Sequence, residues 1–374
     1  MKIPLFKPNL GKEELRNLAQ VFKTGWVGAG PKTQELEAQF AKSIGARHAI
    51  GVTSCTAALH IAAQALGIKK GDEVIVPATT VISTPYAALY NGATPVFADV
   101  EEDTLCLDPE DFERKITSKT KAVIPVHLGG HSCDMDRIMK IARKYKLYVI
   151  EDCANAQGTK YKGRPVGIFG NIGCFSFEAK KNMTTGDGGM LTTNSLQWAE
   201  KLRAFRWYGS RNDTWKRFSG NNKYSWHYDV AELGWKYNMN DIMAAIGLAQ
   251  FKKLPLALSK KDKIRARYNK ELQGISWLAT PKDRSYTHSG YWLYVIRIKN
   301  GRRDKFIKYM GEKGITTGVH FPPVYHHSYF KKLGISAFCP VAEKVGKEIV
   351  SLPFFSTMKP SEFSYVVKSI RQFR

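Results

Sequence analysis

The sequence lacks the marks of a secreted, disulfide-bonded or membrane-spanning protein. Its 374 residues include only six cysteines, which stand singly without a CxxC pair, so neither a zinc site nor a disulfide framework is predicted. No segment reaches the roughly 18 uninterrupted apolar residues that span a bilayer. The N-terminal stretch "MKIPLFKPNLGKEEL" has neither an apolar core nor a small-residue cleavage site. Together these absences predict a soluble protein of a reducing cytoplasm, with no metal and no membrane partner.

Acidic residues are also scarce. The chain has 33 of them against 57 lysines and arginines, which gives a net charge of +24 and a pI near 9.7. Such a charge suits nucleic acid, a membrane surface or an anionic small substrate. The basic residues are dispersed, without a basic arm or an aromatic-interleaved RNA motif. We therefore favour a charge that aids solubility or steers a substrate over a polymer-binding face, and we expect no nucleic-acid partner.

Short apolar runs alternate with amphipathic stretches between about residues 47 and 200. The runs are typical of strands and the amphipathic stretches of helices. This alternation predicts a mostly parallel sheet with helices on both faces, in which ligands bind beyond the carboxyl ends of the strands. The predicted strands are 73–79, 94–100, 121–127 and 146–153, and the predicted helices include 55–67 and 135–146.

The pattern changes after residue 240, where a smaller α+β unit is predicted. We therefore divide the chain into a large domain, 1–240, with an N-terminal arm, and a small domain, 241–374. The polar, turn-rich stretch 208–230 is predicted to be a long loop, and loops of that length are often functional or mobile. In the small domain we expect helical segments at 240–254, 258–272, 304–314 and 362–373, and a strand at 291–298.

Two adjacent lysines follow the predicted strand "NIGCFSF" (171–177) and precede a glycine-rich stretch. If the chain stays extended, Lys180 and Lys181 point to opposite faces, so only one can reach a given pocket. A lysine in a partly desolvated pocket can form a Schiff base with a carbonyl, including the aldehyde of pyridoxal phosphate (PLP).

That cofactor also needs an acid for its pyridine nitrogen and donors for its phosphate. Asp152, at the carboxyl end of a predicted strand, could be the acid, and it could equally be the N-cap of a following helix. The free N–H groups of Thr56 and Ala57 at the start of helix 55–67 could hold the phosphate, although many strand-to-helix turns look similar. Ser176 could add a hydroxyl.

The segment "FSFEAKKNMTTGDGGM" resembles the cofactor-lysine segment of the DegT/DnrJ/EryC1/StrS family, the PLP-dependent aminotransferases of nucleotide sugars. The resemblance covers nearly the whole chain. It implies an α/β protein of the fold type I, aspartate aminotransferase-like architecture. Further matching segments are "GWVGAGPKTQELEAQFA", "TSCTAALH", "GATPVFADV", "EDCANAQGTKYKG", "LGWKYNMNDIMAAIGLAQ", "GVHFPPVYHH" and "LPFF".

The resemblance assigns the lysine. The family's cofactor lysine stands just before Asn and six residues after the Phe that opens "FSF", which is Lys181 here. Lys180 occupies a position that is usually small or apolar. The resemblance further implies that Asp152 pairs with the pyridine nitrogen and that the phosphate is held by Thr56, Ala57 and Ser176.

Other positions depart from the family pattern or shape the substrate pocket. Asn155 stands where Gln or His commonly bonds the cofactor's phenolic oxygen. Lys236 stands where a neighbouring subunit often supplies an Asn to the phosphate, and Asn238 follows two places on, so either could reach. The residues implied for the sugar pocket are His320, Tyr325 and His326.

The implied function is amino-group transfer from an amino acid, glutamate in the family, through PLP onto a keto sugar of a nucleotide-diphospho-sugar. The segment "LGWKYNMNDI" favours C4 of a UDP-linked sugar, for amino-sugar biosynthesis in a surface polysaccharide, with C3 and other nucleotides open. A homodimer with shared active sites is expected. The alternatives are a sugar dehydratase, which carries His in place of the lysine, and a basic nucleic-acid-binding protein with a vestigial cofactor site.

Overall fold

The central element is a seven-stranded sheet with the strand order β1-β9-β8-β5-β4-β2-β3. A computed structural model describes residues 1–211, 215 and 228–373. Strand β9 runs antiparallel to both β1 and β8, and the other neighbouring strands are parallel. The sheet consists of β1 (His48–Val52), β2 (Glu73–Pro77), β3 (Thr94–Ala98), β4 (Thr120–Val123), β5 (Tyr148–Asp152), β8 (Ile172–Ser176) and β9 (Gly189–Thr193).

The predicted strands lie where the apolar runs placed them, whereas β1 and β9 were not predicted. Every residue of β8 and β9 is buried, so these strands are covered on both faces and show no alternation. Glycine is required at the first residue of β9, because a Cβ on Gly189 would lie 2.6 Å from the carbonyl carbon of Ser54. This close approach brings β9 against the start of the helix that follows β1.

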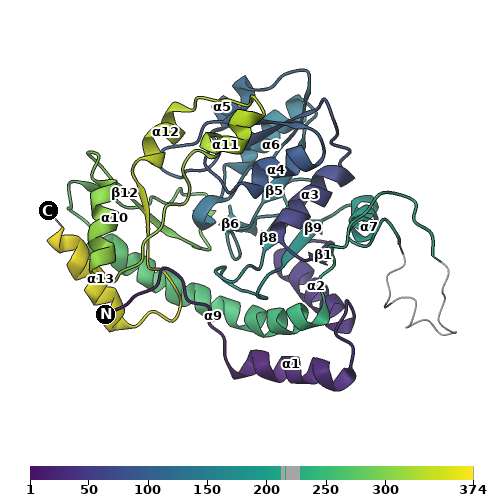
Figure 1. Ribbon diagram of the computed structural model, residues 1–374, viewed down its shortest axis with the longest axis horizontal. Helices are drawn as coiled ribbons and strands as arrows, with labels where there is room; N and C mark the ends of the chain where they lie inside the picture. The colour runs from purple at the N-terminus through teal and green to yellow at the C-terminus, as the bar shows by residue number, and fades with distance from the viewer. Residues whose placement is uncertain (212–214, 216–227, 374) are drawn as a thin grey trace.

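Helices surround this sheet, and together they form the first hydrophobic core (Figure 1). They are α2 (Pro31–Ile44), α3 (Cys55–Ala65), α4 (Ser83–Tyr90), α5 (Pro109–Arg114), α6 (Met135–Lys144) and α7 (Leu196–Phe205). From the C-terminal part of the chain, α11 (Ser328–Lys332) and α12 (Pro340–Gly346) also pack here, since Phe330 and Val345 lie in the first core.

A second core lies at the end of the molecule where both chain termini are found (Figure 1). Ile3 joins this core and bridges to Ile315, so the N-terminus packs on the small C-terminal unit.

A further small sheet has the order β11-β6-β7. The second core is built from β10 (Leu278–Ala279), β12 (Tyr294–Ile298), β13 (Ile349–Leu352), α10 (Arg303–Glu312) and α13 (Pro360–Gln372), and the small sheet from β6 (Lys160–Tyr161), β7 (Arg164–Pro165) and β11 (Thr287–His288).

Helix α9 (Asp241–Glu271) connects the two cores. The sequence predicted two helical segments here, and the structure has one helix of 31 residues that continues through Pro255. Leu248 lies in the first core and Tyr268 in the second. By length and composition alone α9 could cross a membrane, and 39% of its most apolar window is buried within the protein. The boundary after residue 240 remains a prediction, because both cores draw on residues from each side of it.

Asp241, the first residue of α9, also binds the start of helix α2. The carboxylate of Asp241 accepts hydrogen bonds from the backbone N–H groups of Gly30, Lys32 and Thr33, at 2.9 to 3.0 Å. These are the otherwise unsatisfied donors at the start of α2. A carboxylate there stabilises the helix end, and α1 (Lys12–Thr24) packs against the same long helix. Most of the predicted loop 208–230 lies outside the described residues.

Candidate active site

A cavity of about 340 Å³ lies beyond the carboxyl ends of β5 and β8. This is where ligands bind in parallel sheets of this kind. The cavity brings together most of the predicted site residues, which the sequence separates by up to hundreds of positions. The predicted residues that line it are Thr56, Asp152, Asn155, Ser176, Lys181 and His320.

The two lysines lie in a turn, so the predicted extended arrangement is wrong. The backbone N–H of Lys181 donates to the carbonyl oxygen of Glu178 at 2.9 Å, which closes the turn directly after β8. The turn nevertheless separates the two side chains. The Lys180 side chain is 62% exposed, whereas Lys181 Nζ lies 3.4 Å from the centre of the Trp292 ring.

Burial makes Lys181 a weaker base than an ordinary lysine. Removal of Nζ from water lowers its pKa to about 8, against the opposing effect of the Glu178 carboxylate. The aromatic face of Trp292 still favours the ammonium over an entirely apolar surrounding. A considerable fraction of Lys181 is therefore neutral, and able to act as a nucleophile or base, near pH 8.

Asp152 is buried at the end of β5, and burial raises the pKa of its carboxyl group. Its Oδ2 accepts from the hydroxyl of Thr84 at 2.8 Å, and its Oδ1 from the N–H of Ala154 at 3.0 Å. A turn, and not a helix, follows Asp152, so the alternative interpretation as a helix N-cap does not hold. These two hydrogen bonds fix the position of the carboxylate in the wall of the cavity.

The start of α3 forms another wall. Ser54 is the N-cap, and its Oγ accepts from the N–H of Ala57 at 3.1 Å, so that predicted donor is already occupied. Ala57 does not line the cavity, whereas Thr56 does. Ser176 contributes a hydroxyl whose oxygen accepts from the N–H of Glu178 at 3.3 Å, which leaves its proton available to a ligand. Hydroxyls and a helix N-terminus together make a good anion site.

Trp292 is the main residue that sequence reasoning missed. Its ring covers Lys181 and stacks on Phe6 from the N-terminus, with centroids 5.5 Å apart. Its Nε1 donates to the carbonyl oxygen of Lys180 at 2.8 Å, which fixes the ring over the lysine turn. Trp292 stands in the apolar stretch that predicted a strand, but β12 begins only at Tyr294, and nothing in that pattern marks a site residue.

His320 lies in the same wall. Its Nδ1 is 2.8 Å from the hydroxyl of Ser351, and its ring packs edge-on against Trp292. Burial lowers the pKa of His320 to about 4, and the positive charges of Lys181 and Lys180 act in the same direction. The imidazole is therefore neutral at physiological pH and available as a hydrogen-bonding group.

Other predicted residues lie elsewhere. The Tyr325 hydroxyl is buried and donates to Glu343 at 2.7 Å, and His326 Nε2 lies 2.8 Å from the same carboxylate, so neither lines the cavity. Lys236 and Asn238 line a separate cavity of about 260 Å³ together with Trp26 of the N-terminal arm. Within this chain they are not brought to Lys181.

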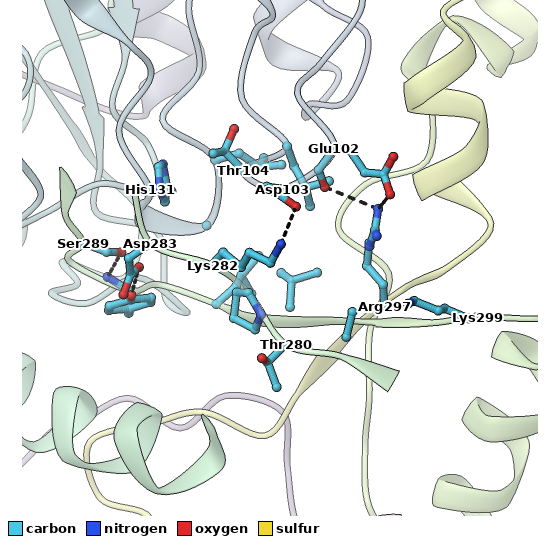
Figure 2. Close-up of a pocket in the computed structure, with 18 residues that line it drawn as sticks. Glu102, Asp103, Thr104, His131, Thr280, Lys282, Asp283, Ser289, Arg297 and Lys299 are labelled. Atoms are coloured by element: carbon cyan, nitrogen blue, oxygen red, sulfur yellow. Dashed lines mark hydrogen bonds and ion pairs between the residues drawn. The ribbon is translucent and has the colours of Figure 1, made fainter. Parts of the chain in front are cut away.

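A further cavity of about 200 Å³ lies between the first core's loops and the small C-terminal unit (Figure 2). Two ion pairs cross it: Lys282 Nζ lies 3.6 Å from Asp103, and Arg297 lies 2.7 Å from Glu102. These ion pairs connect the two units across the cavity. The residues that line it include neither Lys181 nor Asp152.

His127, Glu151 and Cys153 form a buried cluster with the residue types of a metal site. The Glu151 carboxylate already accepts from three backbone N–H groups, those of Gly167, Phe169 and Gly170. His127 Nδ1 accepts from a backbone N–H, so its proton lies on Nε2, which donates to Glu151 at 3.1 Å. These bonds account for the cluster as a support for the end of β5.

Comparisons with known proteins agree with the geometry. The sequence model of the DegT/DnrJ/EryC1/StrS aminotransferase family matches residues 8–371. The spore coat polysaccharide biosynthesis protein SpsC of Bacillus subtilis is 41% identical, over 99% of this chain and 96% of its own length. The uncharacterized protein MJ1066 of Methanocaldococcus jannaschii is 40% identical, over 99% and 97%.

Solved structures confirm the predicted fold class. The putative sugar aminotransferase Spr1654 of Streptococcus pneumoniae is 29% identical and is known in forms with PLP and with pyridoxamine phosphate. The PLP form superposes with a TM-score of 0.92 over 100% of both chains, and the pyridoxamine phosphate form with 0.93 over 98% of both.

We predict that the Lys181 side chain titrates near pH 8. Reductive ¹³C-methylation followed by NMR should show one lysine resonance with a midpoint near that value, because burial favours the neutral amine. Replacing Glu178 with Gln removes a negative charge that favours the ammonium, so the midpoint should fall further. A midpoint that stays near the value of an exposed lysine would contradict the burial argument.

Proposed function

Because the chain belongs to the DegT/DnrJ/EryC1/StrS aminotransferase family, we propose that it transfers an amino group from glutamate onto the keto sugar of a nucleotide-diphospho-sugar. The chain is a PLP-dependent sugar aminotransferase. The observation that carries the proposal is the single cavity in which Lys181, the buried Asp152 and the start of α3 converge.

The residues of this cavity fit PLP. Asp152 would hold the pyridine nitrogen, since its carboxylate is buried and fixed by Thr84. Thr56, Ser176 and the N-terminus of α3 would hold the phosphate. Asn155 would contact the phenolic oxygen, because its side chain lines the cavity. When bound, PLP supplies an electron-withdrawing ring that stabilises negative charge on the substrate carbon.

Lys181 is proposed as the catalytic residue. Its Nζ is the covalent attachment point, and after release it moves the proton between carbons of cofactor and substrate. The pKa of about 8 suits this work, because a group that titrates near the operating pH can both accept and return a proton. Trp292 shields this amine from water and limits the directions in which it can move.

The substrate assignment rests on the relatives and on the charge. One relative is named for spore coat polysaccharide biosynthesis, and a structural relative for sugar transamination. A diphosphate brings about two negative charges, which the +24 balance of this chain would attract. The segment "LGWKYNMNDI" supports our proposal of C4 of a UDP-linked keto sugar as the acceptor position, and the spore coat relative supports surface-polysaccharide biosynthesis as the destination.

The alternatives are weaker. A sugar dehydratase of the same fold carries His at the cofactor position, and this chain has Lys181 there, facing the cavity. A nucleic-acid-binding protein with a vestigial site would have no need of a buried Asp152 and a desolvated lysine in one cavity, each of which costs folding free energy.

We also propose a homodimer with shared active sites. Helix α1 exposes large apolar side chains, with Leu15 68% and Phe22 62% exposed, and apolar faces of this kind are typical of interfaces. Lys236 and Asn238 line a cavity separate from that of Lys181. The family resemblance implies that one of them reaches the cofactor phosphate of a neighbouring subunit, and we propose that arrangement here.

Lys181→Ala should abolish covalent PLP attachment, because Lys181 Nζ lies under the Trp292 ring in the wall of the cavity. Lys180→Ala should retain it, since that side chain is largely exposed. The measurement is the visible absorbance of the bound cofactor and its fixation to the chain by borohydride. The reverse result for the two variants would assign the chemistry to Lys180.

Purified protein with PLP and glutamate should aminate a UDP-4-keto-sugar, with the product identified by mass spectrometry and NMR. Controls are the matching 3-keto sugar, the same sugar on another nucleotide, and Lys181→Ala. Amination of the 3-keto sugar alone would overturn the C4 assignment. Failure with every keto sugar nucleotide, by a protein that binds PLP, would overturn the proposed function.

Mixing inactive chains should restore part of the activity if the sites are shared. One chain carries Lys181→Ala and the other carries both Lys236→Ala and Asn238→Ala. A mixed dimer then has one intact composite site, so up to about a quarter of wild-type activity is expected on random pairing. No recovery in a verified mixed dimer, or full activity of a sedimenting monomer, would refute this arrangement.

A further inference from the structure

Helix α9 carries a lysine in the interior of the protein. Lys261 is 6% exposed, although lysine is among the residues least often buried. Its neighbour Lys260 is exposed, as lysines on helix surfaces usually are. An ammonium group removed from water costs folding free energy unless it is paired or hydrogen-bonded. The contacts of Lys261 therefore indicate why a lysine stands there.

Those contacts are with the segments on either side of Lys181. Lys261 Nζ donates to Oδ1 of Asn182 at 2.8 Å and to the carbonyl oxygen of Trp292 at 3.2 Å. It also lies 4.5 Å from the centre of the Phe354 ring. Among the described residues no carboxylate lies within ion-pair distance of it. The lysine is held by neutral oxygens and an aromatic face.

Asn182 and Trp292 are the two residues that frame Lys181. Asn182 follows it directly, and its Nδ2 donates to the carbonyl oxygens of Gly290 at 2.6 Å and Gln157 at 3.3 Å. Trp292 covers Lys181 Nζ and bonds the carbonyl oxygen of Lys180. The hydrogen bonds therefore form a closed chain. Asn182, next to the lysine turn, bonds Lys261, Lys261 bonds the Trp292 backbone, and the Trp292 ring bonds the carbonyl oxygen of Lys180 in the turn.

We propose that Lys261 is a positioning residue that holds the lysine turn against Trp292, so that Lys181 Nζ stays aimed into the cavity and shielded from water. This rests on the proposed role of Lys181. Lys261 touches neither the cavity nor Lys181, and acts through Asn182 and the Trp292 backbone.

A lysine suits this task in either protonation state. Burial lowers the pKa of Lys261 to about 7. The ammonium has three N–H donors and the neutral amine keeps two, which is the number of oxygens it contacts. The long unbranched stem also lets a donor on α9 reach between the two loops, where a shorter amide or hydroxyl side chain would fall short.

The test compares Lys261→Met, which keeps the length and removes the donors, with Lys261→Arg, which keeps donors. Lys260→Met is the matched control on the same helix. The measurements are thermal unfolding, the dissociation constant for PLP, and the pKa of Lys181 from ¹³C-methyl NMR. All binding and titration data are taken well below the unfolding midpoint of each variant.

In Lys261→Met we expect PLP to bind about tenfold more weakly and the Lys181 pKa to rise towards the ordinary lysine value, because water reaches the amine when Trp292 moves. Lys261→Arg should recover part of the PLP affinity, and Lys260→Met should match wild type. A folded Lys261→Met protein with a lower unfolding temperature and unchanged PLP affinity and Lys181 pKa would overturn the proposal, since Lys261 would then be structural only.

If Lys261→Met fails to fold, Asn182→Ala removes the same hydrogen bond from its other end. Wild-type PLP affinity and Lys181 pKa in that variant would also overturn the proposal. These measurements need no sugar substrate. A wild-type protein that binds PLP and transfers no amino group would overturn the proposed function and leave the test of Lys261 intact.

Discussion

The site depends on one constraint: a turn that is itself neither strand nor helix must keep its lysine facing an aromatic ring from a distant part of the chain. Residues 178–181 follow β8 as a turn, and Trp292 precedes β12 in the small unit. Helix α9 runs between these regions and packs in both hydrophobic cores. The geometry of the lysine therefore depends on how the two cores are joined, as much as on the sheet that carries it.

The sequence predicted the sheet well because its strands are covered on both faces and read as apolar runs. Asp152 and Ser176 stand at the carboxyl ends of those runs. The sequence therefore placed them correctly at the edge of the sheet where the cavity lies, and both line it. The strands β1 and β9 were missed, since short stretches with glycine and threonine carry little strand signal. The pairing of β9 against β8 is a tertiary contact that no local pattern encodes.

Two predicted site residues, Ala57 and Tyr325, do not line the cavity for the same physical reason. Ala57 and Tyr325 have suitable chemistry, but each hydrogen bond is already satisfied within the protein, by Ser54 and by Glu343. A sequence shows which groups could bind a ligand and not which have internal partners. Trp292 and Lys261 were missed for the opposite reason: their roles come from distant neighbours, Lys181 and Asn182, that only the folded chain brings to them.

One physical effect explains the unusual ionisation in this region. Burial lowers the pKa of Lys181 and of His320, and raises that of Asp152, so each group is driven towards its neutral form. A cavity in this condition is suited to a ligand that brings its own charges. A protonated ring nitrogen beside Asp152 would restore the carboxylate by ion pairing, and a phosphate at the start of α3 would meet the helix N-terminus. The desolvation that weakens the basicity of Lys181 therefore also strengthens any ion pair that a bound cofactor forms with these groups, because charges attract more strongly where water is excluded.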